Sequence, residues 1–203
     1  MMAKNAVPHS TGLLDRQFGH PSGLLGSLVG EAMAIEHQAL HREIVDRLAL
    51  KASDRVLEIG FGPGTALRLA ARKAEFVAGI DPSAAMVRQA RRRNRRAIKS
   101  GRVQVVQASA SAIPFAAGSF SVVFEVHSYH HWDRPEAGLR EAFRVLKTGG
   151  RLLMVLRGGR EGNEPALHEA DEISRVLRGT GFRELRLEEH HSGPGGVILT
   201  AVR

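Results

Sequence analysis

Short apolar runs of strand length alternate along this chain with helix-like segments, and this alternation constrains the fold more than any other feature. The runs stand at 55–59, 76–80, 103–107, 120–126 and 151–156. Strands joined in this way form right-handed crossovers, so they lie parallel in one sheet. We therefore predict an α/β fold with a mainly parallel sheet covered by helices on both faces.

The C-terminal part departs from this alternation. Two further runs, 182–190 and 196–202, are separated by Ser192-Gly-Pro-Gly195, a sequence typical of a turn. They predict an antiparallel hairpin at the end of the chain.

Length and composition fit one ordinary globular domain. The 203 residues are 43% hydrophobic and 25% charged, which is enough to bury a substantial core. A helical pattern from about Leu28 to Leu50 precedes the first strand. We expect one domain over residues 29–203. Residues 1–28 would form either a lid over the site or a flexible segment.

Several classes of protein are excluded by what the sequence lacks. The absence of cysteine rules out disulfides, thiolate metal ligands and cysteine nucleophiles. No apolar run approaches the roughly 20 residues that a membrane span needs, and no signal-peptide pattern opens the chain. We expect a soluble cytoplasmic protein without membrane contact, either a monomer or a homodimer.

The formal net charge of +8 comes from one stretch. Residues 82–102 hold eight basic side chains and no acidic one, so the rest of the chain is neutral. Apolar residues at helical spacing predict one amphipathic helix there, with the arginines facing solvent. The alternative is that the Arg88 to Lys99 face binds RNA or an acidic partner, but no aromatic residues for base stacking occur in the stretch. The apolar residues of the helix are Met86, Val87, Ala90, Ala97 and Ile98.

A glycine-rich turn, Gly60-Phe-Gly-Pro-Gly64, follows the first predicted strand and precedes a helix. Glycine lets the backbone approach a ligand closely, and free amides at a helix start point toward it. Asp81 ends the next strand, where its carboxylate can accept hydrogen bonds from both hydroxyls of a ribose. The pair predicts a nucleoside-containing ligand.

The spacing of the glycines discriminates between cofactors. Dinucleotide-binding folds use G-x-G-x-x-G, whereas the third glycine here is Gly64, and no Gly-Lys-Ser/Thr follows for a triphosphate. A ligand without phosphate, such as S-adenosylmethionine, fits better. A nicotinamide-dependent oxidoreductase is the more distant alternative.

Segments in the same order resemble the motifs of the Rossmann-like, class I S-adenosylmethionine-dependent methyltransferases. The resemblance implies a doubly wound, seven-stranded, mainly parallel sheet with a C-terminal antiparallel hairpin. It also implies methyl transfer from S-adenosylmethionine to oxygen, nitrogen or carbon of a small organic acceptor. The matching segments are Val56 to Thr65, Gly79 to Ser83, Val105 to Phe115, Phe120 to Trp132 and Arg144 to Arg151.

The same resemblance assigns residues to the cofactor. Glu58 and the glycine turn would hold the methionine part, Asp81 the ribose, and Pro82 with Met86 the adenine. Ser109 stands where the family often has an aspartate for the adenine amino group, and a neutral hydroxyl accepts that bond more weakly. The full predicted set is Glu58, Gly60, Phe61, Gly62, Gly64, Asp81, Pro82, Met86, Ser109, Ala110 and His127.

Polar and aromatic side chains follow the fourth predicted strand, in Glu125-Val-His-Ser-Tyr-His-His-Trp132. Parallel sheets bind ligands at this carboxyl edge, so we place the acceptor there. His127 could face the methionine part, while His130 or His131 could take a proton from the acceptor at neutral pH. The alternative is that these histidines only cap the strand and shape the pocket.

Two histidine pairs raise the question of a metal. His37 and His41 lie four residues apart, and His190 adjoins His191, but no third ligand is evident. We predict no metal site.

Overall fold

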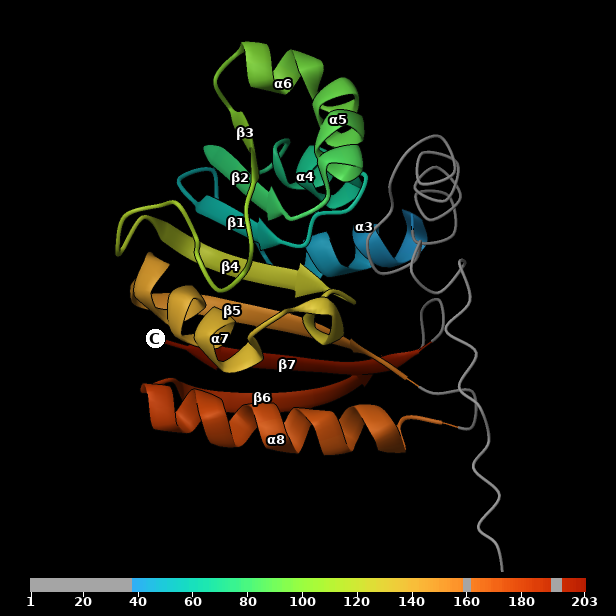
Figure 1. Ribbon diagram of the computed structural model, residues 1–203, viewed down its shortest axis with the longest axis vertical. Coiled ribbons are helices and arrows are strands. Elements are labelled where there is room, and N and C mark those ends of the chain that lie inside the picture. The colour runs from blue at the N-terminus through green and yellow to red at the C-terminus, as the bar shows by residue number, and fades with distance from the viewer. Residues whose placement is uncertain (1–37, 159–161, 191–194) are drawn as a thin grey trace, which may run out of the picture.

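The computed structural model describes residues 38–158, 162–190 and 195–203, which build a seven-stranded sheet. The strands are β1 (Arg55–Ile59), β2 (Phe76–Asp81), β3 (Val103–Gln107), β4 (Phe120–Val126), β5 (Leu146–Arg157), β6 (Arg183–His190) and β7 (Gly196–Val202). Their order in the sheet is β3-β2-β1-β4-β5-β7-β6 (Figure 1). The first five pair in parallel, and β7 pairs antiparallel with both β5 and β6. The predicted fold class is thereby confirmed.

The strand order reverses beside β1. The chain moves outward from β1 through β2 to β3 and then returns to β4 on the other side of β1. At such a switch point the connections after neighbouring strands diverge, which opens a crevice at their carboxyl ends. This topology places the ends of β1, β2 and β4 around one space.

Helices accompany the sheet and bury its two faces. They are α3 (Gln38–Arg47), α4 (Thr65–Ala70), α5 (Ala84–Arg93), α6 (Arg95–Lys99), α7 (Pro135–Val145) and α8 (Glu164–Thr180), with a 3₁₀ turn η1 at Tyr129–His131. Buried side chains of α3, α4 and α5 belong to one apolar cluster, and those of α7 and α8 to another. Each face of the sheet therefore has its own core.

Strand β5 shows why the strands appear as continuous apolar runs. Leu153 and Val155 belong to the cluster of α3 to α5, whereas Leu152, Met154 and Leu156 belong to that of α7 and α8. Successive side chains of a strand point to opposite faces, so a strand covered on both faces needs an apolar residue at nearly every position.

The observed strands match the predicted runs to within one residue, except for β5. It begins at Leu146, five residues before the predicted start, and its pairing with β4 shifts register between Phe120 and Val122. The extra residues gain backbone partners from the chain end, because Gly149 N donates to Arg203 O and Arg203 N donates to Gly150 O, each at 2.9 Å. Pairing with the C-terminus thus extends the start of β5 beyond what the local sequence predicts.

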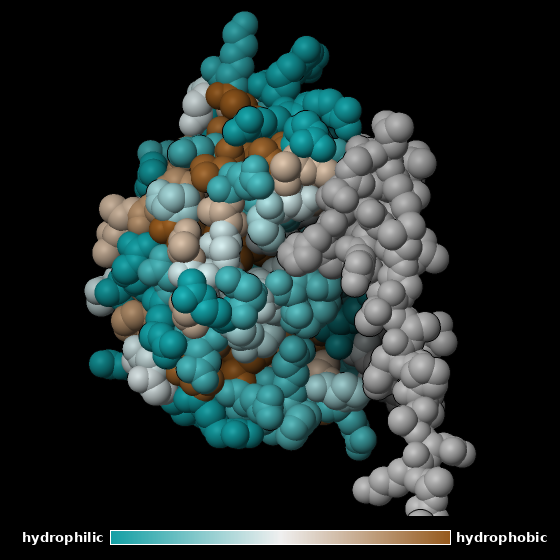
Figure 2. Space-filling view, in the orientation of Figure 1, coloured by the Kyte–Doolittle hydropathy of each residue, from teal (hydrophilic) through white to brown (hydrophobic). Residues whose placement is uncertain are grey.

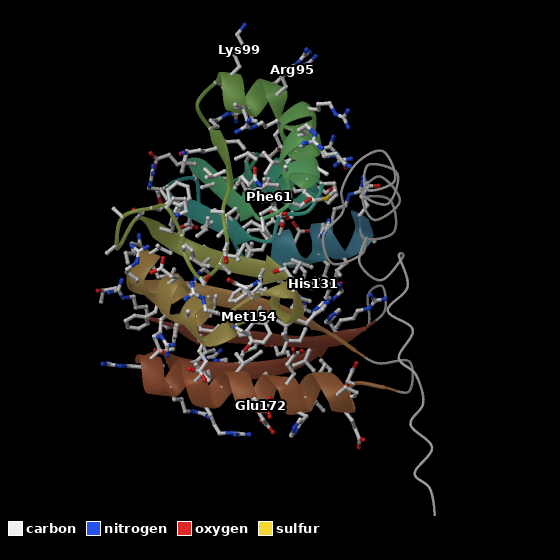
Figure 3. All side chains as sticks on the ribbon, viewed as in Figure 1. Phe61, Arg95, Lys99, His131, Met154 and Glu172 are labelled. Carbon is white, nitrogen blue, oxygen red and sulfur yellow. The ribbon has the colours of Figure 1, made fainter. Side chains whose placement is uncertain are left out.

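The predicted single basic helix is wrong in one respect, because Asn94 divides it into α5 and α6. The Asn94 amide donates to Ala90 O at 2.9 Å and to Gly64 O at 3.0 Å. This side chain ties the helix end to the glycine turn, and such side-chain bonds to the backbone compete with helix continuation. The arginines stay exposed except for the half-buried Arg93, and Arg95 and Lys99 point away from the fold (Figure 3). Hydrophilic side chains project from the same end of the molecule in Figure 2.

The predicted helix at Leu28 to Leu50 is described only in part, as α3. Leu40, Ile44 and Val45 of α3 are buried, as the helical spacing predicts. Residues 1–37 lie outside the described part of the chain, so the predictions of a lid or flexible segment at 1–28 and of a domain boundary at 29 stay predictions.

We predict that Gly64→Ala destabilises the protein more than Gly118→Ala. Both glycines have positive φ, +77° and +68°, so alanine is strained at either position. A Cβ on Gly64 would lie 2.7 Å from the Ala90 Cβ, whereas one on Gly118 would meet nothing within 4 Å. The clash adds about 1–3 kcal/mol to the loss at Gly64. Thermal unfolding of both variants measures the difference, and equal losses would contradict the packing role of Gly64.

Candidate cofactor site

A cavity of about 350 Å³ opens at the carboxyl ends of β1, β2 and β4. Its walls come from the turns after these strands, from the segment after β3 and from His41 of α3. This is the crevice that the strand reversal creates. The cavity unites residues that lie up to 92 positions apart in the sequence, from His41 to Asp133.

The glycine turn after β1 needs its glycines for two different reasons. Gly60, Gly62 and Gly64 all have positive φ, which side chains rarely tolerate. A Cβ on Gly60 would lie 2.3 Å from the Ser128 Cβ, so only glycine lets the β1 turn pass the segment after β4. Gly62 borders the cavity, and a Cβ there would meet no atom within 4 Å.

The Asp81 carboxylate, at the end of β2, hydrogen-bonds both to the glycine turn and to the turn that starts α5. It accepts hydrogen bonds from Gly62 N at 2.9 Å and from Ser83 N at 2.8 Å, and the side chain is buried. Ser83 in turn caps α5 by accepting from Met86 N. Asp81 therefore sets the glycine turn and the start of α5 in fixed positions around the cavity.

Glu58 brings a second buried carboxyl to the cavity wall. Within the described residues its Oε2 has no hydrogen-bond partner. Burial raises the pKa of Glu58 well above its usual range, and the nearby Asp81 and Glu125 add to this, against a hydrogen bond from Leu67 N. A buried carboxyl with an open oxygen is suited to a cationic ligand, because a positive charge would stabilise its ionised form.

Glu125, near the end of β4, organises the segment that follows. One carboxylate oxygen accepts from Ser128 N at 2.8 Å, from the Ser128 hydroxyl at 3.0 Å and from Tyr129 N at 3.1 Å. The other accepts from Val155 N at 3.0 Å. Burial raises the pKa of Glu125 to about 7, despite these hydrogen bonds, which favour the charged form. This carboxyl joins β4, β5 and η1 beneath the cavity.

The histidines after β4 take different positions. His127 and His131 line the cavity, whereas His130 does not. The rings of His130 and His131 lie 3.9 Å apart, and removal from water, with His131 and Arg157 adding, lowers the pKa of His130 to about 4. His127, at the unusual φ of +54°, stacks on His190 with 6.4 Å between ring centroids. Figure 3 labels His131, the last residue of η1.

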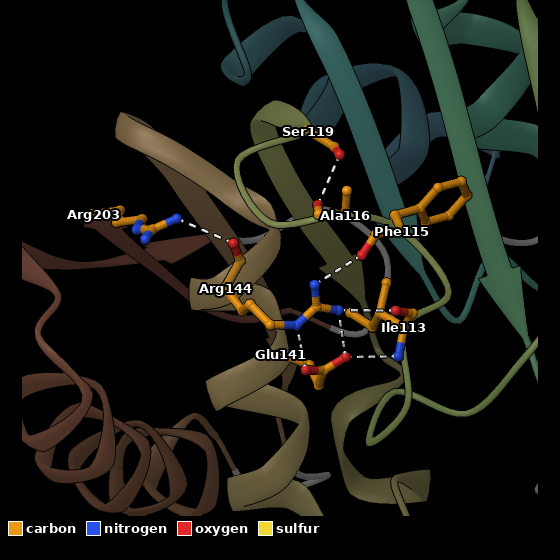
Figure 4. Close-up of polar contacts among 7 residues, drawn as sticks. All are labelled: Ile113, Phe115, Ala116, Ser119, Glu141, Arg144 and Arg203. Carbon is orange, nitrogen blue, oxygen red and sulfur yellow. Dashed lines mark hydrogen bonds and ion pairs between the residues drawn. The ribbon is translucent and has the colours of Figure 1, made fainter.

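The segment between β3 and β4, which carries Ser109, has no helix in the described structure and is held by an arginine clamp (Figure 4). The Arg144 guanidinium donates to Ile113 O at 2.9 Å and to Phe115 O at 2.8 Å. Glu141 accepts two bonds from Arg144, at 2.6 and 2.8 Å, and a third from Ile113 N. The bidentate pair lowers the pKa of Glu141 and fixes the segment to α7.

Most predicted cofactor residues come together in this cavity. Gly64 is the exception, since it packs against α5 and not against the open space. The ten that line the cavity are Glu58, Gly60, Phe61, Gly62, Asp81, Pro82, Met86, Ser109, Ala110 and His127.

Sequence reasoning missed four residues at the site. His41, Ser128 and Asp133 line the cavity, and Glu125 supports it from below. Ser128 and Glu125 lie inside the segment quoted after β4, so their place in the sequence was the available signal. His41 lies on α3, which precedes β1 and the glycine turn in the sequence, and no sequence motif marks Asp133.

Among the described residues, neither a metal-type cluster nor a helix able to cross a membrane is found. No cluster of three or more His, Cys, Asp or Glu there is arranged to hold a metal ion. His37 and His191 lie outside the described part, so the prediction of no metal stays a prediction. None of the described helices has the length and apolar character that crossing a bilayer requires.

Comparison with known proteins identifies the family. Residues 57–154 match the methyltransferase domain family. The chain is 32% identical over 132 residues to the uncharacterized methyltransferase YdaC of Bacillus subtilis, covering 64% of this chain and 71% of that protein. This chain belongs to the S-adenosylmethionine-dependent methyltransferases. The resemblance in its motifs is thereby confirmed.

Two further likenesses of this methyltransferase are informative. It is 39% identical over 116 residues to the 27-O-demethylrifamycin SV methyltransferase of Amycolatopsis mediterranei, covering 55% of this chain and 43% of that protein. A SAM-dependent methyltransferase structure from Aquifex aeolicus superposes with a TM-score of 0.65 at 22% identity, covering 79% of this chain and 88% of that one. The structural likeness shows the shared fold.

The cavity of this methyltransferase fits its cofactor chemically. The described residues that line it include Glu58, Asp81 and Asp133 but no lysine or arginine. S-adenosylmethionine carries a sulfonium and an ammonium group and no phosphate, so carboxyls attract it, whereas they would repel a dinucleotide pyrophosphate. Membership of this family and the acidic lining of the cavity both argue against a nicotinamide cofactor.

We predict a specific pH dependence of stability from Glu125. A pKa raised from the ordinary 4.5 to about 7 means that the folded protein holds this proton more tightly than the unfolded chain. The resulting stabilisation is complete below pH 4.5 and is lost as the pH rises through 7, by at most about 3 kcal/mol. Glu125→Gln cannot titrate there and lacks this loss.

Denaturant unfolding of both proteins between about pH 5 and pH 8 tests the prediction. The stability of the wild type relative to Glu125→Gln should fall as the pH rises. Groups far from Glu125 titrate equally in both proteins and cancel in the difference, whereas the pKa of Glu58 is raised less once the Glu125 charge is removed. Parallel pH profiles would show that Glu125 does not hold a raised pKa.

Proposed function

We propose that this protein transfers the methyl group of S-adenosylmethionine to a small organic acceptor that enters at the histidine-rich end of β4. One observation carries the proposal: a single cavity joins buried carboxyls suited to a cationic cofactor with polar and aromatic side chains at its other edge. Glu58 and Asp81 represent the first group, and His127, His131 and Trp132 the second.

The positions of individual residues support a role for each in binding the cofactor. Asp81 has its buried carboxylate at the end of β2, in place to accept from the ribose hydroxyls. The open Oε2 of Glu58 lies on the β1 side, where it suits the ammonium group of the methionine part. Pro82 and Met86 offer apolar surface on the α5 side for the adenine.

The sulfonium of the bound cofactor supplies a methyl group already activated for in-line displacement. The protein therefore has to align the acceptor and exclude water. His131 lines the cavity and can accept a proton from an acceptor hydroxyl or amine. The lowered pKa of His130 makes that residue a weak base at neutral pH.

The acceptor class is supported by relatives. The Amycolatopsis relative is named for 27-O-demethylrifamycin SV, a single organic compound methylated on oxygen. This chain spans less than half of that protein, so the acceptor is inferred from chemistry common to both. We also propose that the protein acts in the cytoplasm, where S-adenosylmethionine is made. Methylation of a small acceptor needs no nucleic-acid contact at the Arg88 to Lys99 face.

We predict that Asp81→Ala abolishes binding of S-adenosylhomocysteine. The change removes the ribose acceptor and also releases Gly62 N and Ser83 N from their shared partner. Isothermal titration calorimetry should show at least about a hundredfold weaker binding. Asp171→Ala, an exposed aspartate on α8, serves as the control and should bind as the wild type does. Unchanged affinity in Asp81→Ala would refute the assignment of the site.

We predict that His131→Ala lowers methyl transfer more than His130→Ala. Labelled S-adenosylmethionine is incubated with the protein and an unfractionated cell extract, and label above that of the extract alone is counted in the low-mass and macromolecular fractions after ultrafiltration. Label should enter the small-molecule fraction and fall about tenfold or more in His131→Ala at neutral pH. Equal rates in both variants would remove His131 as the base, and label found only in macromolecules would overturn the proposed acceptor class.

A further inference from the structure

A serine hydroxyl at the cavity wall has its proton directed to a carboxylate from another part of the chain. Ser109, just after β3, donates from Oγ to Asp133 Oδ1 at 2.8 Å. Asp133 lies 24 residues further on, after η1, and both residues line the cavity. Ser111 Oγ reaches the same carboxylate, at 3.2 and 3.3 Å.

Counting protons shows what the Ser109 hydroxyl can offer a ligand. A hydroxyl has one proton to donate and two lone pairs. The proton goes to Asp133, and one lone pair accepts from Ser111 N at 3.2 Å. The hydrogen bond from Ser109 lowers the pKa of Asp133, which keeps the carboxylate charged and able only to accept. The Ser109 and Ser111 hydroxyl oxygens lie 3.0 Å apart, and the Ser111 proton is within reach of the Asp133 carboxylate as well. With both hydroxyl protons directed to Asp133, the remaining valence of Ser109 is a lone pair.

The position of Ser109 indicates which part of the cofactor it meets. Beside it, Ala108 N donates to Asp81 O at 3.2 Å, so Ser109 lies next to the proposed ribose acceptor, on the side of β3. Glu58, proposed for the methionine part, lies on β1, on the other side of β2. With the ribose at Asp81, the adenine therefore lies toward Ser109, against Pro82 and Met86.

Asp133 directly precedes α7, and its carboxylate also accepts from the backbone of Arg134, the N-cap of that helix. Asp133 reaches across to the two serines as well, with Arg134 Nε 3.8 Å from its carboxylate. Its side chain is 57% exposed, so its effect comes from directing a proton and not from a strong field.

We propose that Asp133 is a positioning residue for recognition of the purine base. Because the Ser109 proton is held by Asp133, the Ser109 hydroxyl can only accept a hydrogen bond from a ligand. Such a hydroxyl selects a 6-amino purine over a 6-oxo purine. This inference rests on the proposed cofactor site. The 6-amino group of adenine donates a hydrogen bond, whereas a 6-oxo group presents a second acceptor and repels the lone pair. An unpaired acceptor in a binding site costs affinity.

The test compares S-adenosylhomocysteine with S-inosylhomocysteine, whose base has a 6-oxo group and a protonated N1 in place of the 6-amino group and the bare N1, by calorimetry. The wild type should bind the adenosyl ligand at least about tenfold more tightly. In Asp133→Ala the freed hydroxyl can rotate to donate, so the ratio should fall to within about threefold. A general loss of structure would weaken both ligands together and leave the ratio unchanged.

A second variant makes the test independent of folding losses. Ser109→Asp in the Asp133→Ala background places an acceptor-only group directly at the wall, and it should restore the wild-type ratio. Asp171→Ala should leave the ratio unchanged. A wild-type ratio retained in Asp133→Ala, or no recovery in the double variant, would overturn the role of Asp133. If the wild type bound neither ligand, the proposed cofactor site itself would fail.

Discussion

The carboxylate of Asp81 is the contact on which the rest of the site depends. It accepts from the backbone of the glycine turn and from the backbone that starts α5, and so it joins the ends of β1 and β2. Without it, two backbone amides at the cavity would lose their shared partner, and the glycine turn would keep only its other contacts, such as those of Gly60 N with Ile80 O and of Asn94 with Gly64 O. The cavity is therefore shaped by the same group that is proposed to bind ribose.

Buried carboxyls recur around this cavity, each with a different task. Glu125 has its oxygens occupied by backbone amides and a hydroxyl, and it fixes the segment after β4, where the acceptor is proposed to enter. Glu58 keeps one oxygen open toward the ligand. Burial raises the pKa values of both glutamates, and the nearby Asp81 and Glu125 add to the rise at Glu58, so the charged forms of these groups are costly. A cationic cofactor relieves that cost.

Much of this arrangement was predictable from local sequence. The apolar runs predicted the strands, and the glycine turn with Asp81 predicted the proposed cofactor side of the cavity. Each of these signals depends on residues close in the chain. The break at Asn94 and the early start of β5 were not predictable. The first depends on the distant Gly64 carbonyl, and the second on backbone partners at Gly149, Gly150 and Arg203.

The sequence by itself determined the α/β fold, the residues of the glycine turn and the expectation that ligands bind at the carboxyl edge of the parallel sheet. Only the tertiary structure decided that Gly64 packs against α5, that His131 and not His130 reaches the cavity, and that Asp133 meets Ser109. The physical reason is the same in each case. Periodicity and turn chemistry act over a few residues, whereas these contacts join segments that approach one another only after the sheet has assembled.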